Sequence, residues 1–244
     1  MRLKSSLLIL LFTVACLNIQ AQDALSIVKK LDANLVKIKD KKVNVEMTMT
    51  NLKSGKEKIK KAELYQKGNS KKLFRYTYPE SDAGISTLTL PNNEVYLYLP
   101  MFNKPKKITN MAESNAFNKS DFSINDMATS GYVNSFELTL MDPEGEDYKV
   151  LLIPKDEKSP YTKLVLHINK TYFYRDKIEF YTKSEMHKFA LYHHIKVNGV
   201  WVADEVSMED VKKNHKTTLK MSDIQVNKNL DDSIFTLENL VPSK

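Results

Sequence analysis

The sequence has almost no cysteine, since Cys16 is the only one in the chain. It lies within residues 1–21, where a basic start, an apolar run and a polar stretch follow one another in the order of a secretory signal peptide. We expect cleavage after Ala21, which would remove the cysteine and exclude disulfides. Residues 22–244 must then fold as a single domain on an apolar core.

Long hydrophobic runs are also missing. The run from Leu7 to Ala15 is far shorter than the ~20 residues that a bilayer requires, and no run after residue 22 is longer. We therefore expect an exported, periplasmic protein. Attachment to the outer membrane through a lipid on Cys16 is the weaker alternative, because Thr13 stands where lipoprotein signals prefer a bulky aliphatic residue.

Arginine is scarce, although the formal net charge is +7. Beyond the signal only Arg75 and Arg175 remain, so lysine carries the excess charge. Nucleic-acid binding proteins rely on arginine's planar fork, so we expect no nucleic-acid partner. The lysines either solvate strand exteriors and discourage edge-to-edge association, or they attract an anionic membrane surface or an acidic partner.

Glycine and histidine are too few, and too poorly placed, for the common catalytic sites. None of the six glycines forms a G-x-S-x-G elbow or a phosphate-binding loop. The five histidines include no H-E-x-x-H motif, and the adjacent His193 and His194 must point to opposite faces of a strand. We expect no enzyme, no metal site and no cofactor.

Alternating apolar and polar residues dominate the rest of the chain. Val43 to Thr50 has period two and places Met47 and Met49 on its apolar side. Turn signals recur about every ten residues, and Asn198-Gly199 is the strongest hairpin signal among them. Before this region, residues 24–38 have apolar positions at helical spacing.

These patterns predict a mainly β fold. We expect a curved antiparallel sheet of about ten or eleven strands that forms an incomplete, half-open barrel, because this arrangement leaves few exposed edges. An N-terminal helix and short lid helices would cover its concave face; a two-sheet sandwich is the alternative. The lid would come from the polar stretch 101–134, where Ser123 and Asp126 are spaced as a capping box.

Several short motifs occur between residues 82 and 127: Asp82-Ala83-Gly84, Tyr96-Leu97-Tyr98-Leu99-Pro100, Lys106-Lys107-Ile108, Phe117, Ser120-Asp121-Phe122-Ser123 and Asp126-Met127. In these motifs the chain resembles a known family, the outer-membrane lipoprotein-sorting proteins related to the periplasmic lipoprotein carrier LolA. The resemblance implies an incomplete barrel with a helical lid over an apolar cavity, and a role in carrying lipoproteins or other lipids. The sequence departs from the family in having lysines where arginine is usual, and Asn118-Lys119 in place of a small Met-Gly pair.

The function predicted from these features is that of a monomeric periplasmic carrier, without catalysis. It would bind lipoprotein acyl chains or another lipid and move them toward the outer membrane, aided by a membrane transporter or receptor. The candidate lipid-binding residues are Met47, Met49, Leu73, Val95, Leu97, Leu99, Phe117, Phe122 and Met127. The candidate lid and motif residues are Gly84, Tyr98, Pro100, Lys107, Ser120 and Asp121.

Two other functions stay open. An envelope sensor on the same fold would detect lipoproteins and dock a membrane partner. An envelope hydrolase would need a pocket that joins a carboxylate or histidine to a nucleophile.

Overall fold

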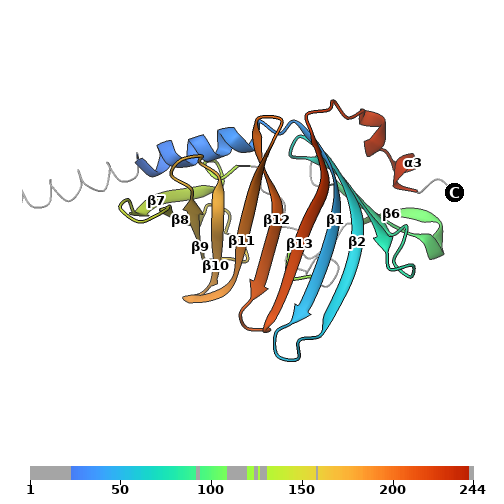
Figure 1. Ribbon diagram of the computed structural model, residues 1–244, viewed down its shortest axis with the longest axis horizontal. Helices are drawn as coiled ribbons and strands as arrows, with labels where there is room; N and C mark the ends of the chain where they lie inside the picture. Colours follow the sequence, from blue (N-terminus) through green and yellow to red (C-terminus); the bar gives the residue numbers. More distant parts are fainter. Residues whose placement is uncertain are drawn as a thin grey trace, which may run out of the picture. The chain divides into compact units, whose positions relative to one another are not determined.

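The fold is mainly β, as the alternation predicts. A computed structural model of the chain describes residues 23–91, 94–108, 120–123, 126, 131–157 and 159–241. Its strands form one antiparallel sheet in the order β6-β5-β4-β3-β2-β1-β13-β12-β11-β10-β9-β8-β7, which does not close into a barrel (Figure 1). The predicted signal peptide, Phe117 and Met127 lie outside the described residues.

The described chain has 13 strands where about ten or eleven were predicted. One reason is β6 (Lys104–Ile108), which pairs with β5 (Glu94–Leu99). Its sequence, KPKKI, lies in the polar stretch 101–134, which is predicted from the sequence to be the source of the lid. A strand at a sheet edge is bonded on one side only, so it tolerates Pro105 and needs no apolar alternation.

The described chain divides into two compact units. The described residues of the first unit fall within 23–35 and 131–186, and those of the second fall within 36–126 and 187–241. The strands of the first unit are β7 (Phe136–Asp142), β8 (Tyr148–Pro154), β9 (Lys163–Ile168) and β10 (Arg175–Thr182).

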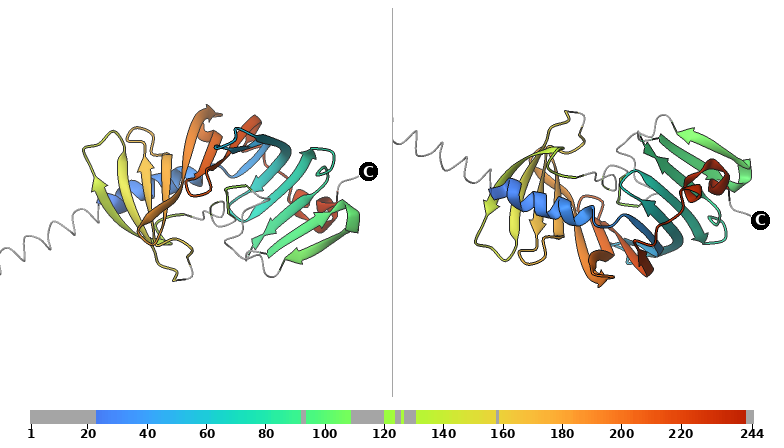
Figure 2. Two further views of the ribbon diagram at one scale, coloured as in Figure 1. Left: turned by 90° about the horizontal axis from the view of Figure 1, so that it is seen from below. Right: turned by 90° about the horizontal axis from the view of Figure 1, so that it is seen from above.

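The core of the first unit is a cross-strand row. Leu140 pairs with Val150, Val150 with Leu166 and Leu166 with Ile178, and all four side chains are buried. The chain is helical over residues 23–35, and this helix runs alongside strands β7 to β10 (Figure 2). The predicted N-terminal helix is therefore present, although it ends three residues before Ile38.

Polar contacts hold the helix in the first unit. The Asp32 carboxylate accepts hydrogen bonds from the backbone N–H groups of Tyr132 and Val133, at 2.9 to 3.1 Å. The Asn34 side-chain amide donates to the carbonyl groups of Tyr172 and Phe173. The buried helix stripe consists of Ala24, Ile27, Val28 and Leu31.

The second unit contains the longer strands. They are β1 (Asp40–Asn51), β2 (Glu57–Lys67), β3 (Lys71–Tyr78), β4 (Ser86–Leu90), β5, β6, β11 (Glu185–Val197, of which the first two residues fall in the first unit), β12 (Val200–Asp210) and β13 (His215–Val226). The β11–β12 hairpin confirms the Asn198-Gly199 turn, since both residues have positive φ (48° and 82°). The described part of this unit also contains the short helices η2 (Pro100–Phe102), η4 (Asp232–Phe235) and α3 (Leu237–Leu240).

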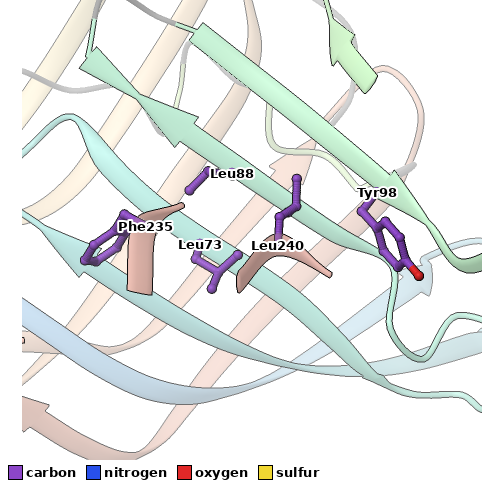
Figure 3. Close-up of a cluster of buried hydrophobic side chains, with 5 residues drawn as sticks. All are labelled: Leu73, Leu88, Tyr98, Phe235 and Leu240. Atoms are coloured by element: carbon purple, nitrogen blue, oxygen red, sulfur yellow. The ribbon is translucent and has the colours of Figure 1, made fainter. Parts of the chain in front are cut away.

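The C-terminal segment covers one face of strands β3 to β5. Phe235 of η4 and Leu240 of α3 pack against Leu73, Leu88 and Tyr98 in a buried cluster (Figure 3). Side-chain caps from Asp231 and Thr236 begin the two short helices. This face is therefore filled by the protein itself.

Candidate functional site

The opposite face of the second unit is apolar along β1. Val43, Val45, Met47 and Met49 alternate along the strand, and each is at most 5% exposed. Residues paired directly across antiparallel strands point to the same face. We call the face that carries Met47 and Met49 the methionine face.

Cross-strand pairing assigns the candidate residues of β3 to β5 to one face or the other. Leu97 pairs with Thr87, Thr87 with Phe74, Phe74 with Leu64 and Leu64 with Val43. Leu97 therefore lies on the methionine face, and so do Val95 and Leu99, which are in phase with it along β5. All three of these β5 side chains are half-buried.

Leu73 and Tyr98 lie on the other face, inside the C-terminal cluster (Figure 3). Alternation in β5 separated Tyr98 from Leu97 correctly, but it could not show that Leu73 shares the face of Tyr98. Both positions are occupied by packing with Phe235 and Leu240. Leu73 is therefore not available to a ligand on the methionine face.

A short polar segment is buried against the methionine face. We call it the 120–126 segment; its described residues are Ser120, Asp121, Phe122, Ser123 and Asp126. The backbone N–H of Asp121 donates to the Thr217 hydroxyl (3.1 Å), and that hydroxyl donates to the Asp121 carboxylate (2.7 Å). Thr217 pairs directly with Met49 and is fully buried, so the 120–126 segment lies over the methionine face.

The Asp121 carboxylate has a second partner on β13. Nδ1 of His215 lies 2.6 Å from Oδ2 of Asp121, the oxygen that also accepts from Thr217. The Asp121 side chain is only 3% exposed. A buried carboxylate needs such partners, because desolvation without them is costly.

The other end of the segment forms the predicted capping box. The N–H of Ser123 donates to the Asp126 carboxylate (2.6 Å), and the N–H of Asp126 donates to the Ser123 hydroxyl (3.2 Å). Nζ of Lys188 lies 2.5 Å from the same carboxylate and also donates to the carbonyl of Asp121. The Lys188 and Asp126 side chains are 6% and 1% exposed, which makes this a buried ion pair.

Sequence reasoning missed these three partners on the sheet. Lys188 is in phase with the buried Ala190 of β11, and a lysine at an inward-facing position requires an anionic partner. The position of Lys188 in the strand therefore predicts a buried anionic partner for it. Nothing in the pattern, however, distinguished Thr217 or His215 from other strand residues.

A second charged pair interrupts the methionine face beside Met47. Lys60 pairs with Met47 across β1 and β2, and its ammonium group lies 2.8 Å from the Asp82 carboxylate. The hydrogen bond from Lys60 holds the pKa of Asp82 below its ordinary value. Nζ of Lys60 also lies 4.8 Å from the ring centre of Tyr76.

The remaining motif residues occupy turns and an edge. Gly84 has φ +82° in the turn after β3, a conformation that suits glycine, and its N–H donates to the carbonyl of Tyr76. Pro100 begins η2 at the tip of the β5–β6 hairpin. The Lys107 ammonium pairs with the Glu94 carboxylate, which raises the pKa of Lys107 and lowers that of Glu94.

A hollow of about 390 Å³ in the second unit is unlike an acyl-chain site. Three of its lining residues are charged, and two of these, Glu46 and Lys61, form an ion pair of 3.1 Å. The lining residues are Asn44, Val45, Glu46, Lys61, Ala62, Glu63, Thr77 and Ser222. The methionine face under the 120–126 segment is therefore the better candidate site.

The described residues show neither a metal site nor a membrane-spanning helix. Across the ranges given above, no three His, Cys, Asp or Glu side chains come together as a metal site requires. In the same ranges no helix has the length and apolar character needed to cross a membrane.

Comparison with solved structures defines the fold as LolA-like. An outer-membrane lipoprotein-sorting domain from Vibrio parahaemolyticus superposes with a TM-score of 0.80 at 21% identity, covering 90% of this chain and 99% of that one. A DUF1329 protein from Desulfovibrio piger gives 0.80 at 18% identity, covering 91% and 99%. A LolA superfamily protein from Nitrosomonas europaea gives 0.71 at 22% identity, covering 88% and 98%.

At the level of sequence, a family model described as an uncharacterized protein matches residues 68–241. The chain therefore belongs to that family. The matched range includes the C-terminal cluster and, in the second unit, β3 to β6 and β11 to β13. No curated protein matches the sequence.

Proposed function

We propose that this protein is a periplasmic carrier that binds acyl chains, of a lipoprotein or another lipid, on the methionine face beneath the 120–126 segment. The observation that carries the proposal is the construction of that segment. A few polar contacts, centred on Asp121 and Asp126, hold it over an apolar strand surface. The β-ladders are formed by backbone groups, so the strands can stay paired when these contacts open.

Physical chemistry supports binding without catalysis. Burying an acyl chain yields ~0.8 kcal/mol per methylene, so a partly enclosed chain binds firmly and needs a trigger for release. Methionine suits such a surface because its flexible thioether adapts to varied apolar partners. Movement of the 120–126 segment would expose the methionine face, and its hydrogen bonds to β13 and β11 would re-form once the ligand had left.

The test begins with the protein purified from a host that exports it. Native mass spectrometry and solvent extraction should recover bound acyl lipid, and the lipid-free protein should take up a fluorescent fatty acid. Leu97→Gln places a polar amide on the methionine face at a half-buried position and should weaken uptake about tenfold. The matched control is Leu191→Gln, at a side chain that is 44% exposed.

Protein that carries no lipid and takes up no fatty acid would refute the proposal. Equal loss of uptake in both variants would show that Leu97 has no special role. Recovery of an inner-membrane regulator, without lipid, would favour the sensor function instead.

A further inference from the structure

The tip of the β5–β6 hairpin exposes two adjacent apolar side chains. Met101 is 81% exposed and Phe102 is 63% exposed, the two highest values among the large apolar side chains of the described residues. Single exposed apolar residues are ordinary, but an adjacent pair at a protruding turn is typical of an interaction site. In the sheet order, β6 is the terminal strand (Figure 2).

The turn is built to hold these side chains outward. Pro100 fixes the start of η2, and no residue of η2 is buried. Asn103 closes it in the left-handed conformation (φ 49°), and its N–H donates to the carbonyl of Pro100. The Asn103 side chain also accepts from the Tyr98 hydroxyl (3.4 Å), which ties the tip to the buried cluster.

Positive charge surrounds the tip. Lys104, Lys106 and Lys107 follow it, whereas Glu94 is the only acidic residue from 94 to 108. Glu94 pairs with Lys107, which leaves Lys104 and Lys106 as exposed cations without an acidic neighbour on this hairpin. Exposed apolar side chains suit the acyl-chain region of a membrane, and neighbouring lysines suit its anionic headgroups.

The two lysines lie on the same face as the candidate lipid site. Lys104 pairs with Leu99 and Lys106 pairs with Leu97, so both point to the methionine face. Lys107 pairs with Tyr96 and points to the other face. A membrane that met the tip would therefore lie next to the side of the hairpin that carries the apolar site residues.

We propose that the β5–β6 hairpin tip docks the protein on an anionic membrane, with Met101 and Phe102 inserted among the acyl chains and Lys104 and Lys106 on lipid phosphates. This role is separate from lipid binding on the methionine face. Either could fail while the other held, and different measurements report on them.

The experiment is flotation of the purified protein with vesicles of phosphatidylglycerol and phosphatidylcholine, compared with vesicles of phosphatidylcholine alone. The native protein should bind the anionic vesicles and bind the neutral ones more weakly. Met101→Ser/Phe102→Ser should reduce the partition coefficient by about tenfold or more, because two buried apolar side chains are lost. Lys104→Glu/Lys106→Glu should reduce it by about tenfold on the anionic vesicles only.

Matched controls change the same chemistry elsewhere. Met141→Ser/Leu191→Ser removes two other exposed apolar side chains, and Lys53→Glu/Lys56→Glu reverses two exposed lysines of the β1–β2 turn. Both control variants should bind as the native protein does. Uptake of fluorescent fatty acid should be unchanged in Met101→Ser/Phe102→Ser and in both control variants.

A second measurement places the tip within the bilayer. In Phe102→Trp/Trp201→Phe the tip carries the only tryptophan, because the native chain has one. Lipids with brominated acyl chains should quench its fluorescence. Absence of vesicle binding, equal binding by all variants, or an unquenched tryptophan would overturn the proposal.

Discussion

Replacing Thr217 by valine removes one hydroxyl group from the contact between β13 and the 120–126 segment while keeping the side chain's shape. That hydroxyl donates to the Asp121 carboxylate and accepts from the Asp121 N–H, at a fully buried position. A hydrogen bond to a charged group is worth about 1.5–3 kcal/mol, and an unsatisfied buried N–H costs about 1–3 kcal/mol. His215 still contacts the carboxylate, so we expect a loss of about 2–4 kcal/mol.

The assay is amide hydrogen exchange, supported by urea unfolding. The free energy of opening at residues 120–123 should fall by the amount lost, which speeds their exchange by about 30-fold or more. The ladder amides of β1 should keep their protection at low urea, because their hydrogen bonds are unaffected.

The control variant is Thr218→Val. Thr218 is the next residue of β13, is half-buried, and pairs with Thr48 on the face opposite to the 120–126 segment. Its replacement should change stability by no more than about 0.5 kcal/mol. If Thr217→Val and Thr218→Val gave the same exchange rates at residues 120–123, the buried contact would not hold the segment.

Three further changes test the folded structure. Burial and the neighbouring Asp147 raise the pKa of Asp176 to about 6. Between about pH 4 and pH 6 the folded state therefore keeps a proton that the unfolded state has released. The free energy of unfolding should fall as the pH rises through this range. Asp176→Asn should therefore stabilise the protein above pH 6, by about 1 kcal/mol after solvent screening, and should flatten the urea midpoint between these pH values. Lys188→Met should cost about 3–5 kcal/mol in urea unfolding, because it leaves the Asp126 carboxylate buried without its cation; a cost below 1 kcal/mol would show that the pair is solvated. Leu240→Ala should lower stability by about 2–5 kcal/mol, because Leu240 is fully buried in the C-terminal cluster; an unchanged thermal midpoint would mean that the C-terminal segment does not contribute to folding.

Local patterns in the sequence determined much of this protein. Period-two alternation predicts β1 and the burial of Met47 and Met49, since strand side chains alternate between two faces. Asn198-Gly199 specifies its hairpin, because both residues accept positive φ. The capping box of Ser123 and Asp126 could also be predicted, because its two partners are only three residues apart in the sequence.

Only the tertiary structure decided which segments meet. Alternation places Leu97 and Tyr98 on opposite faces of the sheet. The segments that cover these faces are distant in sequence: the segment of Leu240 covers one, and the segment of Asp121 covers the other. The partner of Asp121 is Thr217, 96 residues away, and the partner of Asp126 is Lys188, 62 residues away. Such contacts depend on strand register and on the order of strands in the sheet, which short-range patterns do not encode. The sequence by itself therefore determined most of the strands and their two faces. The fold decided that KPKKI forms the edge strand β6 and which face the polar 120–126 segment covers.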